Sequence, residues 1–142
     1  MALLAIIYAI EDMPMAKGEI IFGGLDIQPR IGMAINLGQY SKLPPRIMKR
    51  LRSVRKELQD GLSDVRNQLV HGAHRDMENG ATTLTMVRWK GERREKRFTP
   101  LDIHAVGIRV LELADECWSI RDAIGEWKFG PHRQKNLRDT GA

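Results

Sequence analysis

The chain has 142 residues, of which 42% are hydrophobic and only 6% aromatic, and its formal net charge at pH 7 is +5. This length suits one compact domain, and many aliphatic side chains with few aromatics favour a helical protein over a β-sandwich. The single cysteine, Cys117, excludes an internal disulfide framework and a zinc site built on cysteines. The positive charge is compatible with nucleic-acid binding, but only its distribution can indicate such a function.

The first segment, MALLAIIYAI, is apolar but well short of the ~20 residues that a membrane-crossing helix needs. It has no basic region before the apolar run and no small-residue cleavage site, so we interpret residues 2–13 as a core helix that ends near Pro14. A reducing, cytoplasmic location without a membrane contact is therefore expected. The following AKGEIIFGG is predicted to be a connector, because helix breakers stand on both sides of it.

Two further helices are predicted in the middle of the chain. Asp26 can cap a helix over residues 27–40, in which Pro29 falls in the first turn, where proline is tolerated. After the prolines of SKLPP, residues 45–71 contain no further proline beyond Pro45, and Gly72 is a suitable residue for ending a helix. The apolar residues of this segment step by three or four positions, which is helical periodicity. They are Ile47, Leu51, Val54, Leu58, Leu62, Val65 and Leu69.

Residues 83–89 alternate in polarity, and the sequence KGER with the following REKRF predicts a turn and a second strand. A lone β-hairpin is marginally stable, so we expect it to lie against helices or a partner chain. Thr99, Pro100 and Asp102 then form a capping-box-like helix start. The apolar residues that follow, from Ile103 to Trp127, repeat with alternating steps of three and four, as in a heptad seam.

These elements predict an all-α protein, an up-and-down four-helix bundle with a β-hairpin inserted before the last helix. Residues 1–127 would form a single domain, and residues 128–142 a basic flexible tail, because that segment is polar and broken by Gly-Pro.

Basic side chains gather in the first half of the long middle helix and in the hairpin. Cations in the first turns of a helix oppose its dipole, so this arrangement does not serve to stabilise the isolated helix. A strip that binds RNA phosphates would account for it, whereas the alternative is an ordinary solvated face. The predicted RNA-binding residues are Arg46, Lys49, Arg50, Arg93 and Arg94.

The chain lacks the motifs of common cofactor and metal sites. It contains no GxxxxGK or GxGxxG loop, no HExxH motif and no Cys/His zinc spacing. A metal site from His71, His74, Asp76 and Glu78 is conceivable on composition, but its spacing matches no known pattern. We therefore expect neither a metal ion nor a cofactor.

The segment RNQLVHG closes the predicted long helix. Asn67 and His71 are four positions apart and share a helix face, and Arg66 is long enough to bend toward the imidazole. One interpretation is structural: His71 stabilises the carbonyl end of the helix, and Arg66 pairs with an acidic neighbour. The other is that the three residues form an active site.

The motif and its context favour the second interpretation. The segment, with its polar residue after the arginine, resembles the R-x(4–6)-H motif of the HEPN superfamily of small helical bundles, and the similar order of elements extends over residues 40–127. This resemblance implies a homodimer in which two motifs face one cleft. It also implies metal-independent RNA cleavage, with Arg66, Asn67 and His71 at the site. Because some members belong to toxin–antitoxin or defence modules, it further implies an antitoxin or another protein as a possible partner.

The residue types suit this chemistry. Histidine exchanges protons near neutral pH, and arginine can stabilise negative charge on a phosphorane-like transition state. We therefore expect His71 to act as general acid and base, Arg66 as phosphate clamp and Asn67 as an orienting residue. The alternative is a non-catalytic helical module for dimerisation or interaction. A DNA-binding regulator is a third reading, for which no short helix-turn-helix pair is evident.

Overall fold

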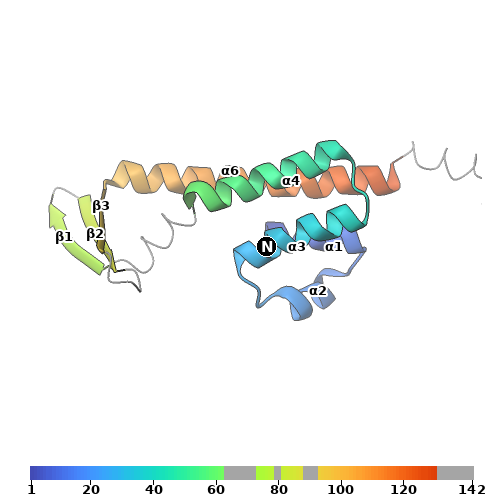
Figure 1. The fold of residues 1–142 in the computed structure, drawn as a ribbon, viewed down its shortest axis with the longest axis horizontal. Coiled ribbons are helices and arrows are strands. Elements are labelled where there is room, and N and C mark those ends of the chain that lie inside the picture. Colours follow the sequence, from blue (N-terminus) through green and yellow to red (C-terminus); the bar gives the residue numbers. More distant parts are fainter. Residues whose placement is uncertain (63–72, 79–80, 88–92, 131–142) are drawn as a thin grey trace, which may run out of the picture. The chain divides into compact units, whose positions relative to one another are not determined.

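The computed structural model describes residues 1–62, 73–78, 81–87 and 93–130, and every structural statement below concerns these residues (Figure 1). This part of the chain is predominantly helical, with five α-helices, so the all-α class is confirmed at the level of helical content. None of these helices is both long and apolar enough to span a bilayer. The chain divides into two compact units, described separately: residues 1–56 with 113–142, and residues 57–112.

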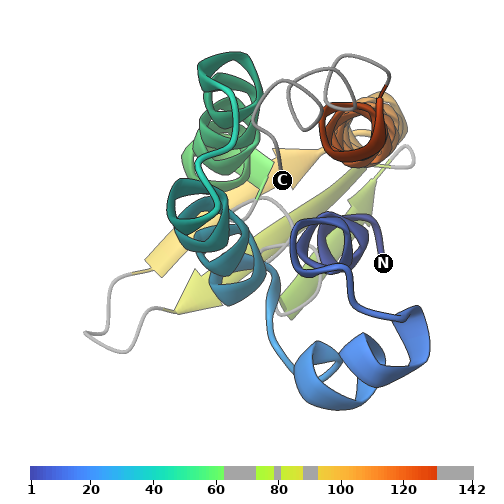
Figure 2. The same cartoon turned by 90° about the vertical axis from the view of Figure 1, so that its right-hand side faces the viewer.

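The first unit contains helices α1 (Ala2–Glu11), α2 (Met15–Phe22), α3 (Ile27–Tyr40), most of α4 (Pro45–Glu57) and the second part of α6 (Pro100–Phe129). Figure 2 looks along these helices, and α1, α3, α4 and α6 surround one core while α2 lies outside. Each of the four contributes side chains that are fully buried. They include Ile6, Ile7, Ile31, Ile47, Leu51, Ile120 and Ile124.

The first helix ends as the sequence predicts, just before Pro14. Asp12 adopts the left-handed conformation, with φ of 52°, and its backbone N–H donates to the carbonyl oxygen of Tyr8. This is the C-terminal cap that glycine usually provides and that aspartate tolerates better than most residues.

The predicted connector over AKGEIIFGG is wrong, because Met15–Phe22 is helix α2. The glycine inside this helix has a packing role. Gly18 is buried, and a Cβ added to it would overlap the Tyr8 ring. The absence of a side chain therefore lets α2 approach α1 closely, at the cost of a weaker helix former in its interior.

The predicted helix over residues 27–40 is confirmed as α3, with Asp26 at its N-cap position, although the Asp26 side chain makes no capping hydrogen bond. Helix α4 begins at Pro45 as expected. At Leu58 the α-helical pattern gives way to a π-helical turn, η1 (Leu58–Leu62). Such turns hold one extra residue per turn and interrupt regular helices. The predicted helix end at His71 and Gly72 lies outside the described residues.

The second unit contains a three-stranded antiparallel sheet in the order β1-β2-β3. Strand β2 (Ala81–Val87) pairs with β3 (Arg93–Phe98), so that Thr82 faces Phe98 and Val87 faces Arg93. Residues 88–92, which include most of the predicted turn KGER, lie outside the described part of the chain. Strand β1 (Ala73–Glu78) pairs with the other edge of β2 and was not predicted, because AHRDME has no alternation of apolar and polar residues.

Helix α6 has the predicted start. The backbone N–H of Thr99 donates to the Asp102 carboxylate over 2.8 Å, and the Asp102 N–H donates to the Thr99 hydroxyl over 3.1 Å. This reciprocal pair is a capping box. The helix also extends beyond the predicted boundary at residue 127, so Lys128 and Phe129 do not belong to a flexible tail. Lys128 is held by the carbonyl oxygen of Ile10 and by the Asp12 carboxylate, 2.9 Å away.

The contact between Gly18 and Tyr8 gives a test of the packing. Gly18→Ala should lower the free energy of unfolding by ~1–3 kcal/mol, because the added methyl group displaces a buried ring. Gly32→Ala is the matched control within α3, where an added Cβ meets nothing within 4 Å. It should raise the stability by about 0.5–1 kcal/mol through helix propensity. Urea denaturation of both variants measures the difference, and equal effects would contradict the packing role.

Candidate functional site

The predicted catalytic residues Arg66, Asn67 and His71 lie outside the described residues, so their roles stay predictions. Two of the predicted RNA-binding residues, Arg93 and Arg94, belong to strand β3, where their backbones pair with Val87 and Met86. His74 lies in strand β1 opposite Leu84. Among the described residues, no three His, Cys, Asp or Glu side chains are close enough together to hold a metal ion.

Helix α4 has one apolar face and one strongly basic face. Ile47, Met48, Leu51 and Val54 are buried in the core of the first unit. The exposed side chains of the same helix include five cations, and no acidic residue occurs before Glu57. These cations, which we call the α4 basic face, are Arg46, Lys49, Arg52, Arg55 and Lys56.

The α4 basic face covers about half of the helix circumference. At about 100° per residue, Arg46, Lys49 and Arg52 follow one another at steps of about 60° around the helix axis, Lys56 lies within about 20° of Lys49, and Arg55 lies about 180° from Arg46. At 1.5 Å per residue the strip from Arg46 to Lys56 is about 15 Å long. It can therefore contact several phosphates of one nucleic-acid strand, since a single strand carries a charge about every 3.4 Å in helical DNA.

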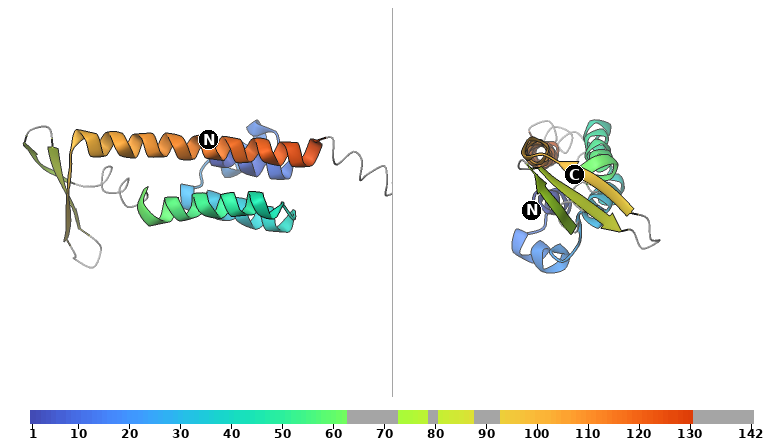
Figure 3. Two further views of the ribbon diagram at one scale, coloured as in Figure 1. Left: turned by 90° about the horizontal axis from the view of Figure 1, so that it is seen from above. Right: turned by 90° about the vertical axis from the view of Figure 1, so that its left-hand side faces the viewer.

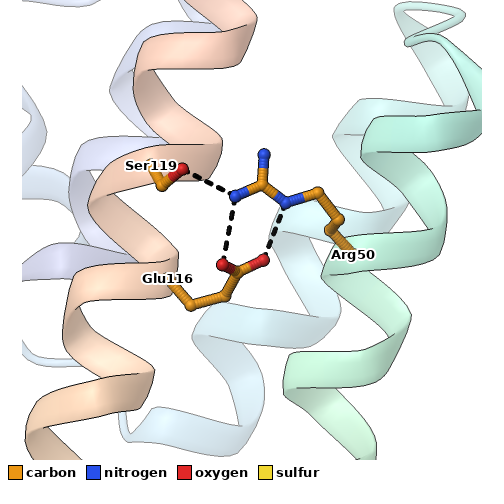
Figure 4. A network of polar contacts seen from close by, with 3 residues as sticks. All are labelled: Arg50, Glu116 and Ser119. Atoms are coloured by element: carbon orange, nitrogen blue, oxygen red, sulfur yellow. Dashed lines mark hydrogen bonds and ion pairs between the residues drawn. The ribbon is translucent and has the colours of Figure 1, made fainter.

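Arg50 stands at the edge of this strip and is held differently. Its Nε donates to Oε1 of Glu116 over 2.7 Å and its Nη2 donates to Oε2 over 3.1 Å, so the ion pair is bidentate (Figure 4). The same Nη2 also donates to the Ser119 hydroxyl over 2.7 Å. Figure 3 shows α4 running alongside the second part of α6, which carries both partners. Arg50 thus links two helices of the first unit, while its third nitrogen points away from Glu116.

The ion pair stabilises the charged forms of both partners. The hydrogen bonds from Arg50 lower the pKa of Glu116 below its ordinary value of 4.5, although partial burial opposes this effect. The same hydrogen bonds raise the pKa of Arg50. Because both side chains remain about one third exposed, solvent screens the pair, and it fixes the geometry of the two helices more than it stabilises the fold.

Cys117 lies next to Glu116 but faces the core. Burial and the neighbouring carboxylate raise the pKa of its thiol to about 11. A thiol with such a pKa is almost entirely protonated at neutral pH and is a poor nucleophile. The buried side chain of the chain's single cysteine therefore serves packing.

The Glu116 carboxylate makes the stability of the first unit depend on pH. Its pKa is lower in the folded state, so its contribution is present above pH 4.5 and is lost as the pH falls through the folded-state pKa. Glu116→Gln should lower the free energy of unfolding at pH 7 by up to about 1 kcal/mol, and the difference from wild type should shrink below pH 4.5. The exposed Glu11→Gln is the control. A pH-independent difference in denaturation midpoints would refute this assignment.

No family model matches this chain, and no match is found among the curated proteins or the solved structures. The likeness to the HEPN superfamily therefore rests on the motif from Arg66 to His71 and on the order of the elements, and it stays a prediction.

Proposed function

We propose that this protein binds single-stranded RNA along the α4 basic face and cleaves it without a metal ion. The observation that carries the proposal is the composition of α4, whose exposed side chains from Arg46 to Lys56 include five cations and no carboxylate. A solvated helix surface usually mixes both signs of charge, which lowers mutual repulsion. A strip of one sign costs repulsion that phosphate binding relieves, because each neutralised phosphate also releases counterions.

The proposed chemistry uses a nucleophile that RNA carries itself. His71 accepts the proton of a 2′-hydroxyl, and the resulting oxygen attacks the adjacent phosphorus. The bond from phosphorus to the 5′-oxygen breaks, and that oxygen takes a proton from an imidazolium. The products are a 2′,3′-cyclic phosphate and a 5′-hydroxyl, so no water, oxidant or metal enters this step. Arg66 would stabilise the charge on the phosphorane-like transition state, and Asn67 would orient His71 or a phosphate oxygen.

The wider proposal is a HEPN-like cytoplasmic protein that forms a homodimer, with an up-and-down four-helix bundle and an inserted β-hairpin. In such a dimer two copies of Arg66 and His71 would face one cleft, and the acid and base could come from different subunits. An antitoxin or another protein partner would fit a role in defence. Arg93 and Arg94 would extend the RNA-binding surface. Arg50 would serve mainly to position α4, because its guanidinium is engaged by Glu116.

A non-catalytic interaction module is the second candidate, and the first part of α6 favours it. Large apolar side chains are exposed there, among them Leu101 at 78%, Leu111 at 67% and Val110 at 51%. Val110 belongs to the predicted heptad seam, whose later members Leu113, Cys117, Ile120 and Ile124 are buried. An apolar seam that is buried over only part of its length suits a protein partner.

Removal of two cations from the α4 basic face tests RNA binding. The Lys49→Gln/Arg52→Gln variant should bind a fluorescent single-stranded RNA more weakly, because two phosphate contacts are lost. For this variant, the slope of the logarithm of the RNA-binding constant against the logarithm of the salt concentration should fall by about 1.4 in magnitude. Lys17→Gln/Lys42→Gln removes the same charge from exposed positions outside α4 and should leave the slope nearly unchanged. Equal effects of the two pairs would show that only net charge matters and would contradict a binding strip.

Cleavage is tested separately from binding. Purified protein in EDTA should cleave single-stranded RNA and leave 2′,3′-cyclic phosphate ends, and His71→Ala and Arg66→Ala should each abolish this activity. Loss of the proton-transfer group His71 should lower the rate by about 10²–10⁴-fold. Analytical ultracentrifugation is the control for assembly. The interaction module would be favoured over the nuclease if the wild type shows no cleavage and His71→Ala converts the dimer to monomers.

A further inference from the structure

A groove lies between α4 and the second part of α6, within the first unit, and has a volume of about 580 Å³. Its α4 side carries Arg46, which belongs to the α4 basic face, and Arg50. Its α6 side carries Trp118 and the carboxylates of Asp115, Asp122 and Glu126. The groove thus combines one aromatic surface, cations on one helix and hydrogen-bond acceptors on the other.

Trp118 gives the groove a flat apolar surface. The indole is partly exposed, and the Arg121 guanidinium lies 5.4 Å from its ring centroid, within the range of a cation–π contact. This contact occupies one face of the ring, and Trp118 lines the groove whereas Arg121 does not. A planar heterocycle can stack on such a ring, and stacking of this kind is how proteins hold unpaired bases of single-stranded nucleic acids.

The carboxylates of the groove favour one part of a nucleotide over the others. Asp115, Asp122 and Glu126 are spaced by seven and four residues, so they lie along one row of α6. Arg121 pairs with Asp122 over 3.0 Å, which neutralises one of the three charges. The remaining acidic side chains repel phosphate but accept hydrogen bonds from N–H groups. The groove therefore fits a nucleobase, and the phosphates fit the adjacent α4 basic face.

Among the bases, guanine has the edge that suits a carboxylate best. Its N1–H and its N2 amino group point in the same direction and can donate two parallel hydrogen bonds to one carboxylate. Uracil offers a single N–H between two acceptor oxygens, which the carboxylates would repel. Adenine and cytosine each present one amino group beside an acceptor nitrogen. A carboxylate therefore discriminates between these bases through the number of donors and the repulsion of neighbouring acceptors.

We propose that this groove is a subsite for one unpaired guanine of an RNA strand, stacked on Trp118 and held through its N1–H/N2 edge by Asp115 or Glu126. The inference rests on the proposed RNA binding and goes beyond it by naming the base. Arg46 lies both on the groove and on the α4 basic face, so a phosphate held by Arg46 can place its base at Trp118.

Fluorescence anisotropy with labelled heptanucleotides tests the subsite. The probes are U7 and the same strand with a central guanine or a central adenine. The wild type should bind the guanine strand at least about fivefold more tightly than U7. Its affinity for the adenine strand should be close to its affinity for U7. Trp118→Ala should weaken guanine-strand binding by at least about fivefold, the lower limit for loss of one stacked base. Trp118→Phe should retain most of the affinity.

A double substitution separates base recognition from stacking. Asp115→Asn/Glu126→Gln should reduce the preference for guanine over uracil to near one, without weakening the binding of U7. Glu11→Gln/Glu19→Gln makes the same change in charge at exposed positions of α1 and α2 and should keep the preference. Both pairs lie outside the buried core, so folding does not obscure the comparison.

The outcomes distinguish the two proposals. If no strand binds to the wild type, both the proposed RNA binding and the guanine subsite are overturned. If binding depends on Lys49 and Arg52 but is unaffected by Trp118→Ala, only the subsite is overturned. If the wild type binds all three strands equally, the groove does not select guanine and the proposal is also overturned.

Discussion

The position of helix α4 depends on one constraint, the burial of a narrow apolar stripe on a helix that is otherwise basic. Ile47, Leu51 and Val54 are each at most 2% exposed. Burying three such side chains contributes several kcal/mol, at ~1.5–3 kcal/mol each, far more than cation repulsion on a solvated face costs. Burial of the stripe therefore fixes which side of the helix faces solvent, and the cations follow. The basic face and the groove beside it are consequences of that packing.

The bidentate pair of Arg50 and Glu116 refines this arrangement. Hydrophobic burial fixes the face of α4 but leaves some freedom to slide or rotate against α6, whereas two parallel hydrogen bonds demand one geometry. The Ser119 hydroxyl adds a third donor–acceptor contact one turn along α6. Because Trp118 lies between these two partners in the sequence, the same contacts that align the helices also define where the groove and its aromatic side chain lie.

The parts of the fold that could be predicted from sequence are those that local chemistry determines. Thr99 and Asp102 specify the start of α6, and Pro45 with the apolar spacing after it specifies the start of α4. Prediction failed where a distant contact reverses a local preference. Residues 16–24 were predicted to be a connector because helix breakers flank them, yet they contain most of α2, in which Gly18 packs against Tyr8. Strand β1 is polar and becomes recognisable only through its pairing with β2. The partners of Arg50, 66 and 69 positions away, have no signature in the sequence, so its role could not be separated from that of Arg46 or Lys49.

The first unit is discontinuous, and this has a consequence for synthesis of the chain. Residues 1–56 form one compact unit with residues 113–142, and Lys128 reaches back to Asp12 at the end of α1. At about 5–20 residues per second, a ribosome needs roughly 3–11 s to add the 57 residues from Lys56 to Leu113. During that interval the first helices exist without the helix that completes their core. The nascent chain therefore keeps part of the apolar surface of α1 and α3 exposed until the second part of α6 has been synthesised, and that is the period in which a chaperone would protect it.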